Sequence, residues 1–118
     1  MILSQIAEHL KLRCLTPSLH SVLDSDIRFG HSSDLLSDVL ANAPSEGILV
    51  TIQGHLNTIA VAVHAEVHAV ILSSGREPEA QVIERATQEG IVLFVSDAST
   101  FDTVGQLYEL GLRGAASE

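Results

Sequence analysis

The sequence predicts an α/β fold, a three-layer α/β/α sandwich with a mainly parallel sheet of about five strands. Short apolar runs alternate with segments of helical periodicity from Asp26 to Leu110, a pattern typical of helices that cover both faces of a parallel sheet. Hydrophobic residues make up 46% of the chain but aromatic residues only 3%, so the core is built from aliphatic side chains. The 118 residues suit one domain, which we place over 1–112, followed by a flexible tail over 113–118.

The N-terminal part of the chain predicts one helix and two strands. Ser4 can cap a first helix, and an apolar strand follows over Leu12–Thr16, closed by Pro17. The stretch Ser18–Ser25 is expected to be an exposed connection. A second strand is predicted over Asp26–Gly30.

The clearest helix follows Ser32, which offers a hydroxyl cap, and an acidic residue lies in the expected first turn. Pro44 and Gly47 mark its end, and the β-branched run Ile48–Gln53 predicts a buried strand. The expected inward stripe of this helix consists of Leu35, Leu36, Val39, Leu40 and Ala43.

The run IAVAVHAEVHAVIL, within Leu56–Leu72, is ambiguous because alternating Ala and Val also suit a strand. A single strand of that length would be atypical. We therefore predict a short buried helix over Asn57–Glu66 and a strand over Val67–Ser73, with the all-strand alternative left open.

The C-terminal part predicts two further helices around one strand. Pro78 suits the first turn of a helix and Gly90 its left-handed cap, and Ile91–Val95 reads as a buried strand. The segment Asp97–Thr100 can cap a last helix. Its expected inward residues are Phe101, Val104, Leu107 and Tyr108.

Net charge and cysteine content indicate which classes of partner are disfavoured and which cellular compartment is expected. Six basic against fifteen acidic side chains give a formal charge of −9, which disfavours nucleic acid and anionic membrane surfaces as partners. No apolar stretch reaches the roughly 20 residues of a membrane-spanning helix. The single cysteine, Cys14, is expected to be a small buried hydrophobe, and no signal-peptide pattern opens the chain, so we expect a cytoplasmic location.

Four loops rich in hydroxyl and amide side chains follow the predicted strands. The carboxyl ends of parallel strands share one edge, where free N–H groups of helix N-termini collect. We therefore expect any site for a small anionic or nucleotide-like ligand there, with Arg76 as a nearby cation and His55 as a titratable group. Each residue taken singly also suits a turn or a helix cap. The candidate ligand-binding residues are Gly54, His55, Asn57, Thr58, Ser73, Ser74, Gly75, Ser96 and Asp97.

Catalytic and cofactor motifs are not found in the sequence. It contains no G-x-x-x-x-G-K-[ST], no G-x-S-x-G and no H-E-x-x-H, so we expect neither catalysis nor a cofactor. The six histidines form no metal-binding pattern with cysteines or carboxylates. His64 and His68 are four residues apart, but the predicted helix ends between them, so no metal site is predicted.

Three sequence segments resemble the DRTGG domain family, and the resemblance covers nearly the whole chain. They are SDLLSDVL at Ser33–Leu40, VTIQGHLNTIAVAV at Val50–Val63 and VILSSG at Val70–Gly75. The resemblance implies a fold similar to the amino-terminal domain of HPr kinase, and it supports the helix that starts near Asn57. The signature Asp-Arg pair is replaced by His55-Leu56, whereas Gly54 and Gly75 match the family pattern.

Such domains occur within phosphotransacetylases and regulatory inorganic pyrophosphatases and as free-standing proteins, some of them associated with iron hydrogenase clusters. The resemblance therefore implies a non-catalytic regulatory or ligand-sensing domain. The alternative is an accessory protein-interaction subunit of a redox or hydrogenase-like assembly.

A homodimer is also predicted from the sequence. The segment Ile59–Val63 is apolar on every side, which a short surface helix should not be unless another molecule covers it. The alternative is that the first helix of the same chain covers this segment.

Overall fold

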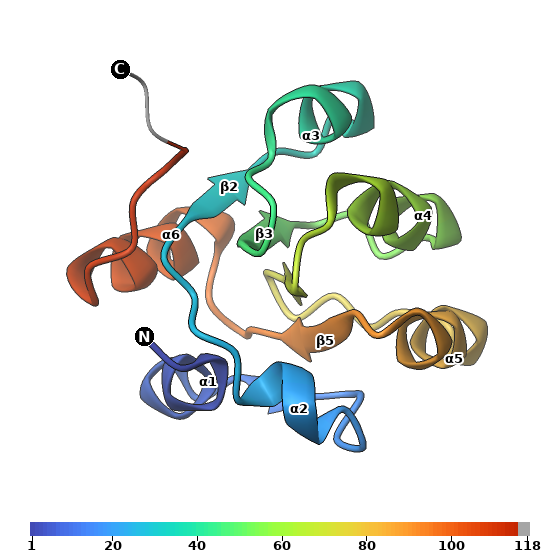
Figure 1. Ribbon diagram of the computed structural model, residues 1–118, viewed down its shortest axis with the longest axis horizontal. Helices are drawn as coiled ribbons and strands as arrows, with labels where there is room; N and C mark the ends of the chain where they lie inside the picture. The colour runs from blue at the N-terminus through green and yellow to red at the C-terminus, as the bar shows by residue number, and fades with distance from the viewer. Residues whose placement is uncertain (116–118) are drawn as a thin grey trace.

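The computed structural model describes residues 1–115 and confirms the predicted fold class (Figure 1). One sheet lies between two layers of helices. Its strands are β1 (Arg13–Cys14), β2 (Gly30–Ser32), β3 (Ile48–Thr51), β4 (Ala69–Leu72) and β5 (Val92–Val95). The helices are α1 (Leu3–Leu10), α2 (His20–Leu23), α3 (Leu36–Asn42), α4 (Leu56–Ala65), α5 (Ala80–Glu89) and α6 (Thr100–Glu109).

The strand order is β1-β5-β4-β3-β2, and only β1 runs antiparallel to its neighbour. From β2 to β5 each strand pairs with the next one along the chain. Crossover connections between parallel strands are right-handed, so successive crossovers in one direction place their helices on the same face. This rule explains why α3, α4 and α5 lie side by side in Figure 1.

The sheet separates two hydrophobic cores. On one face, side chains such as Leu49 and Leu93 pack against α3, α4 and α5. On the other, Ile71 and Phe94 pack against α1 and α6. All residues of β3, β4 and β5 are buried, as expected for parallel strands that are covered on both faces.

The helix predicted within the ambiguous run is confirmed. It forms α4, with Glu66 as a left-handed C-terminal cap, and β4 follows three residues later. Helix α4 lies between α3 and α5, whereas α1 lies on the opposite face of the sheet (Figure 1). The idea that the first helix covers Ile59–Val63 is therefore wrong, and a dimer through that segment stays a prediction.

The second predicted strand is misplaced. Asp26–Gly30 forms only isolated contacts before β2 begins at Gly30, because the Ile27 N–H donates to the carbonyl of Met1 at 2.7 Å instead of to a strand. The predicted exposed connection before it contains α2. Half-buried apolar side chains at helical spacing hold this short helix against the core, namely Leu19, Val22 and Leu23.

Two predicted inward stripes are partly wrong. In α3 only Val39 is fully buried, while Leu35 and Leu40 are 65% and 55% exposed. In α6 the buried residues are Thr103 and Leu107, and the aromatic side chains point outward. In each helix a narrower stripe than the apolar pattern suggests reaches the core.

Of the tail predicted over 113–118, residues 116–118 lie outside the described part. Arg113 is held beside the sheet, where its carbonyl accepts from the Gly30 N–H at 2.9 Å. None of the helices within residues 1–115 has the length and apolar character needed to span a bilayer.

Replacing one leucine in each of two environments tests this account of the core. Leu49→Ala removes a fully buried side chain and should lower the free energy of unfolding by about 2–5 kcal/mol. Leu40→Ala, at a 55% exposed position, should change it by no more than about 0.5 kcal/mol. Urea unfolding measures both, and equal losses would contradict the assignment of these side chains.

Candidate functional site

The candidate site lies at the edge where the four parallel strands end. β2, β3, β4 and β5 share one direction, so the loops that follow them meet there, as the sequence predicts. The nine predicted residues do not form one cavity, however. Three of them line an open groove, and most of the others are hydrogen-bonded within the loops.

The open groove lies between the first turns of α4 and α5 and has a volume of about 240 Å³. The β3–α4 loop contributes the predicted residues Gly54, His55 and Asn57. The α5 side contributes Glu79 and Gln81, which the sequence analysis did not include. Their signal was available, because they follow Pro78 in a helix predicted to start at the same edge.

The backbone of the groove offers free donors. Neither α4 nor α5 has a side-chain hydrogen bond at its N-cap, which is His55 in α4 and Glu79 in α5. The first N–H groups of a helix have no partner within the helix, and they carry the positive end of its dipole. Two such ends beside one groove favour a ligand with hydrogen-bond acceptors or negative charge.

Gly54 lies at a closely packed position. A Cβ added at this position would lie 3.3 Å from Cδ1 of Leu72 and 3.7 Å from Cβ of Pro78. The loop backbone therefore passes close to β4 and to the entry of α5. Thr58 lies beneath it, buried, and donates a hydrogen bond to the Gln53 carbonyl at 2.7 Å. These contacts fix the position of the α4 N-terminus.

The other predicted residues join β4 and β5. Ser73 Oγ is hydrogen-bonded to the Thr100 hydroxyl, and Ser96 Oγ lies 3.1 Å from Thr103 Oγ1. Ser74 and Gly75 both adopt positive φ and donate their N–H groups to the next loop, to the carbonyls of Ala98 and Ser96. The crevice between β4 and β5 is closed by these bonds.

Charged side chains lie over this closed part of the edge. Arg13 on β1 pairs with Glu77, and the pKa of its guanidinium is raised first by that hydrogen bond and then by the charge of Glu77. Asp97 is exposed beside Gly75. Arg76, the cation predicted near the site, is also exposed.

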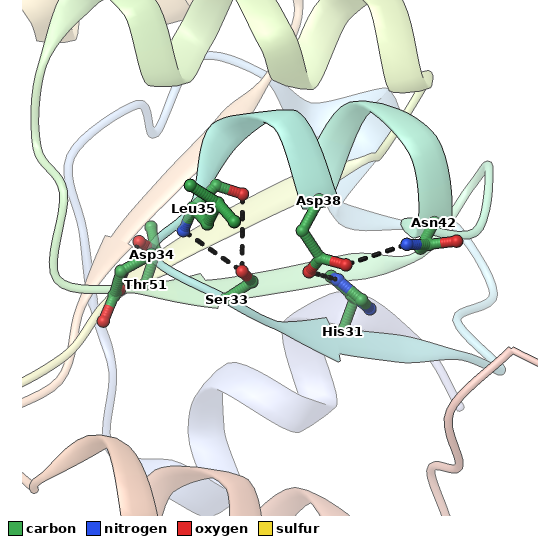
Figure 2. Close-up of polar contacts among 7 residues, drawn as sticks. All are labelled: His31, Ser33, Asp34, Leu35, Asp38, Asn42 and Thr51. Atoms are coloured by element: carbon green, nitrogen blue, oxygen red, sulfur yellow. Dashed lines mark hydrogen bonds and ion pairs between the residues drawn. The ribbon is translucent and has the colours of Figure 1, made fainter.

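The fourth loop, between β2 and α3, carries a polar network that the predicted site residues did not include (Figure 2). Asp34 accepts hydrogen bonds from Thr51 Oγ1 at 2.8 Å and from the Ile52 N–H at 2.9 Å. It therefore ties the start of α3 to the end of β3. Within residues 1–115 no group of three His, Cys, Asp or Glu side chains is arranged to hold a metal ion.

The second half of this network joins β2 to α3. His31 Nε2 lies 2.8 Å from Asp38 Oδ2, and Asn42 Nδ2 donates to Asp38 Oδ1 at 2.8 Å (Figure 2). Hydrogen bonds to its carboxylate lower the pKa of Asp38 to about 2. The largest contribution comes from Asn42, followed by His31 and then Ser33. The network is explained by its structural role in holding α3 on the sheet.

Comparison with known proteins supports the fold. No protein-family model matches the sequence, and no curated protein matches it significantly. The structure is similar to the crystal structure of the CBS and DRTGG domains of the regulatory region of Clostridium perfringens pyrophosphatase, complexed with its activator diadenosine tetraphosphate. The TM-score is 0.71 at 13% sequence identity, and the match covers 89% of this chain and 45% of that chain.

The chain has a DRTGG-like fold, as the resemblance in its sequence implied. At 13% identity the likeness concerns the fold alone. This chain spans less than half of the length of that neighbour.

The Asp38 network predicts a defined dependence of stability on pH. An unfolded aspartate titrates near about 3.9, whereas the folded pKa is about 2, so the carboxylate stabilises the fold above that range. This stabilisation should be lost as pH falls from about 4 to about 2.

Urea unfolding at pH 5 and pH 2 measures the loss. Asp38→Asn should show a smaller drop in unfolding midpoint than the wild type over that interval, because it has no carboxylate to protonate. Asn42→Ala should give an intermediate drop, since it removes the hydrogen bond that lowers the pKa most. Equal drops in all three proteins would show that Asp38 makes no such contribution.

Proposed function

We propose that this protein is a non-catalytic regulatory domain that senses a small anionic or nucleotide-like ligand in the groove between α4 and α5. The observation that carries the proposal is the groove itself, where two helix N-termini without side-chain caps lie at the carboxyl edge of a parallel sheet. Ligands of α/β sheets bind at such edges.

The side chains of the groove suit a ligand with both charged and polar parts. His55 offers ring nitrogens that can donate or accept a hydrogen bond, and the amides of Asn57 and Gln81 offer donors and acceptors. Glu79 works against a strongly anionic ligand, because its carboxylate lies in the same groove. This mixture favours a nucleotide-like molecule, whose base uses the amides while one phosphate lies at the N-terminus of α4.

The similar fold of a regulatory region that binds diadenosine tetraphosphate supports this ligand class. The lack of catalytic sequence motifs is consistent with sensing rather than chemistry. A cytoplasmic location is part of the proposal and agrees with the single cysteine, which cannot form a disulfide within the chain.

The alternative is an accessory subunit that bridges proteins in a redox or hydrogenase-like assembly. It is favoured by two exposed leucines, Leu35 just before α3 and Leu40 within it. The two functions predict different behaviour of the isolated protein, because only the sensor binds a small molecule without a partner.

A thermal-shift screen tests the sensing function directly. Adenine nucleotides, diadenosine tetraphosphate, acetyl phosphate, inorganic phosphate and divalent metals are each added to the purified chain. A ligand at about a hundred times its Kd stabilises the folded state by about 2.7 kcal/mol, so true binders stand out. No shift with any nucleotide or phosphate compound would contradict the proposal and favour the bridging alternative.

Two substitutions in the groove should have opposite effects on the affinity for any anionic ligand that the screen finds. His55→Ala should weaken binding, because it removes a ring whose nitrogens can hydrogen-bond a ligand in the groove. Glu79→Gln should strengthen binding, because it removes a carboxylate from the groove. Isothermal titration measures both.

Control variants separate the groove from general effects of charge. His64→Ala removes an exposed histidine from the other end of α4 and should leave the affinity as in the wild type. If His55→Ala and Glu79→Gln also bind like the wild type, these side chains do not take part in recognition.

A further inference from the structure

A second cavity lies on the face of the sheet that α1 and α6 cover, between the edge strand β2, helix α6 and the residues that follow this helix. We call it the β2–α6 cavity. Its volume is about 170 Å³. An apolar protein cavity of about 150 Å³ can hold a benzene molecule, so this one has room for an aromatic ring or a short acyl chain. Its apolar wall consists of Val50, Val104, Leu107, Tyr108 and Leu112.

Gly30 on β2 lines this cavity and leaves space in it. It pairs with Ile48 of β3, whose side chain belongs to the core on the same face, so a side chain at position 30 would point into the cavity. A Cβ there would meet only the Ile48 carbonyl oxygen, at 3.7 Å, and the φ of Gly30 is not positive. Packing within the chain therefore does not require a glycine, although glycine weakens a strand. The empty position is accounted for if a ligand occupies the space.

The guanidinium of Arg113 is held in place at the border of the cavity. Its Cζ lies 3.6 Å from the centroid of the Tyr108 ring, and both residues line the cavity. Nη1 donates hydrogen bonds to the carbonyls of Tyr108, at 3.0 Å, and of Leu112, at 2.8 Å. A guanidinium has five N–H donors, and those on Nε and Nη2 have no partner within residues 1–115. This edge offers the two parallel donors that a carboxylate accepts in a bidentate pair.

The charges near the cavity favour an anion with a single negative charge. Arg13 and Arg85 pair with carboxylates of their own chain, whereas Arg113 has no such partner in the described part of the chain. None of the described residues that line the cavity is acidic, although the chain has fifteen acidic side chains. The net charge of −9 repels ligands with several negative charges. One carboxylate is therefore the anion that suits this guanidinium.

We propose that the β2–α6 cavity binds a small monocarboxylate with a compact apolar body, of the size of an aromatic ring or a short acyl chain. The apolar body occupies the space beside Gly30, against Leu107 and Leu112. The carboxylate accepts hydrogen bonds from Nε and Nη2 of Arg113. A neutral apolar molecule uses only the first of these features and a bare small anion only the second, so both bind more weakly.

The β2–α6 cavity is independent of the proposed ligand groove. No described residue lines both of them. Helices α4 and α5, which form the groove, lie on the opposite face of the sheet from α6 (Figure 1). Failure of carboxylate binding and failure of nucleotide binding can therefore be recognised separately, because each ligand changes the amide signals of a different face.

Titration of the wild type at neutral pH, followed by backbone amide chemical shifts, tests the choice of ligand. Benzoate is the probe, benzamide has a similar shape without the charge, and acetate has the charge without the ring. Benzoate should bind at least about tenfold more tightly than either and shift the amides of Gly30, Ser32 and Gly114. No binding of benzoate, equal affinity for benzamide, or shifts confined to Gly54 and His55 would overturn the proposal.

Substitutions on two sides of the cavity test its location. Arg113→Gln removes the donors and Gly30→Val fills the space, so each should raise the Kd for benzoate by about tenfold or more. Arg113→Lys keeps the charge without the planar pair of donors and should also weaken binding. Both Arg113→Gln and Gly30→Val should keep the circular dichroism spectrum, because Arg113 is exposed and a Cβ at position 30 has room.

Arg85→Gln is the matched control. It removes the same charge from an exposed position on α5, on the opposite face of the sheet, and should bind benzoate like the wild type. Wild-type affinity in either Arg113→Gln or Gly30→Val, or an equal loss in Arg85→Gln, would overturn the proposal.

Discussion

Burial of both faces of the central strands is the constraint on which the rest of the structure depends. Every residue of β3, β4 and β5 is buried, and each strand has only four residues. Strands this short present apolar side chains to both sides, so each face needs its own layer of helices. One layer is supplied by the crossover helices and the other by the two ends of the chain, α1 and α6.

The same constraint shapes the carboxyl edge of the sheet. Hydroxyl groups that follow β4 and β5 are buried, and a buried polar group must find a hydrogen-bond partner. Ser73 and Ser96 therefore bond to hydroxyls of α6, and no buried side-chain nitrogen or oxygen among the described residues lacks a partner. The edge closes between β4 and β5 and stays open between the first turns of α4 and α5.

Most of the fold could be predicted from local patterns. The split of the alternating Ala and Val run was decided by length, since a helix and a short strand fit a small domain better than one long strand. Gly90 marked the end of α5 because its left-handed conformation favours glycine. The loops that meet at the carboxyl edge followed from the parallel order of the strands alone.

The errors arose where distant contacts decided the structure. Asp26 and Ile27 pair with the N-terminal residues and not with a strand, and no local pattern contains that information. Phe101 and Tyr108 have the periodicity of a buried stripe but lie on the outside of α6. The sequence placed Ser73 and Ser96 in a ligand site, but it could not indicate that their hydroxyls bond to α6.

Chemical-shift mapping of the backbone amides during titration with an adenine nucleotide tests the central claim most directly, because it locates binding residue by residue. The groove predicts the largest changes at Gly54, His55 and Asn57, together with Glu79 and Gln81 across the opening. Amides of the closed β4–β5 loops should change less. Changes confined to other parts of the molecule, or none at a saturating concentration, would contradict the account.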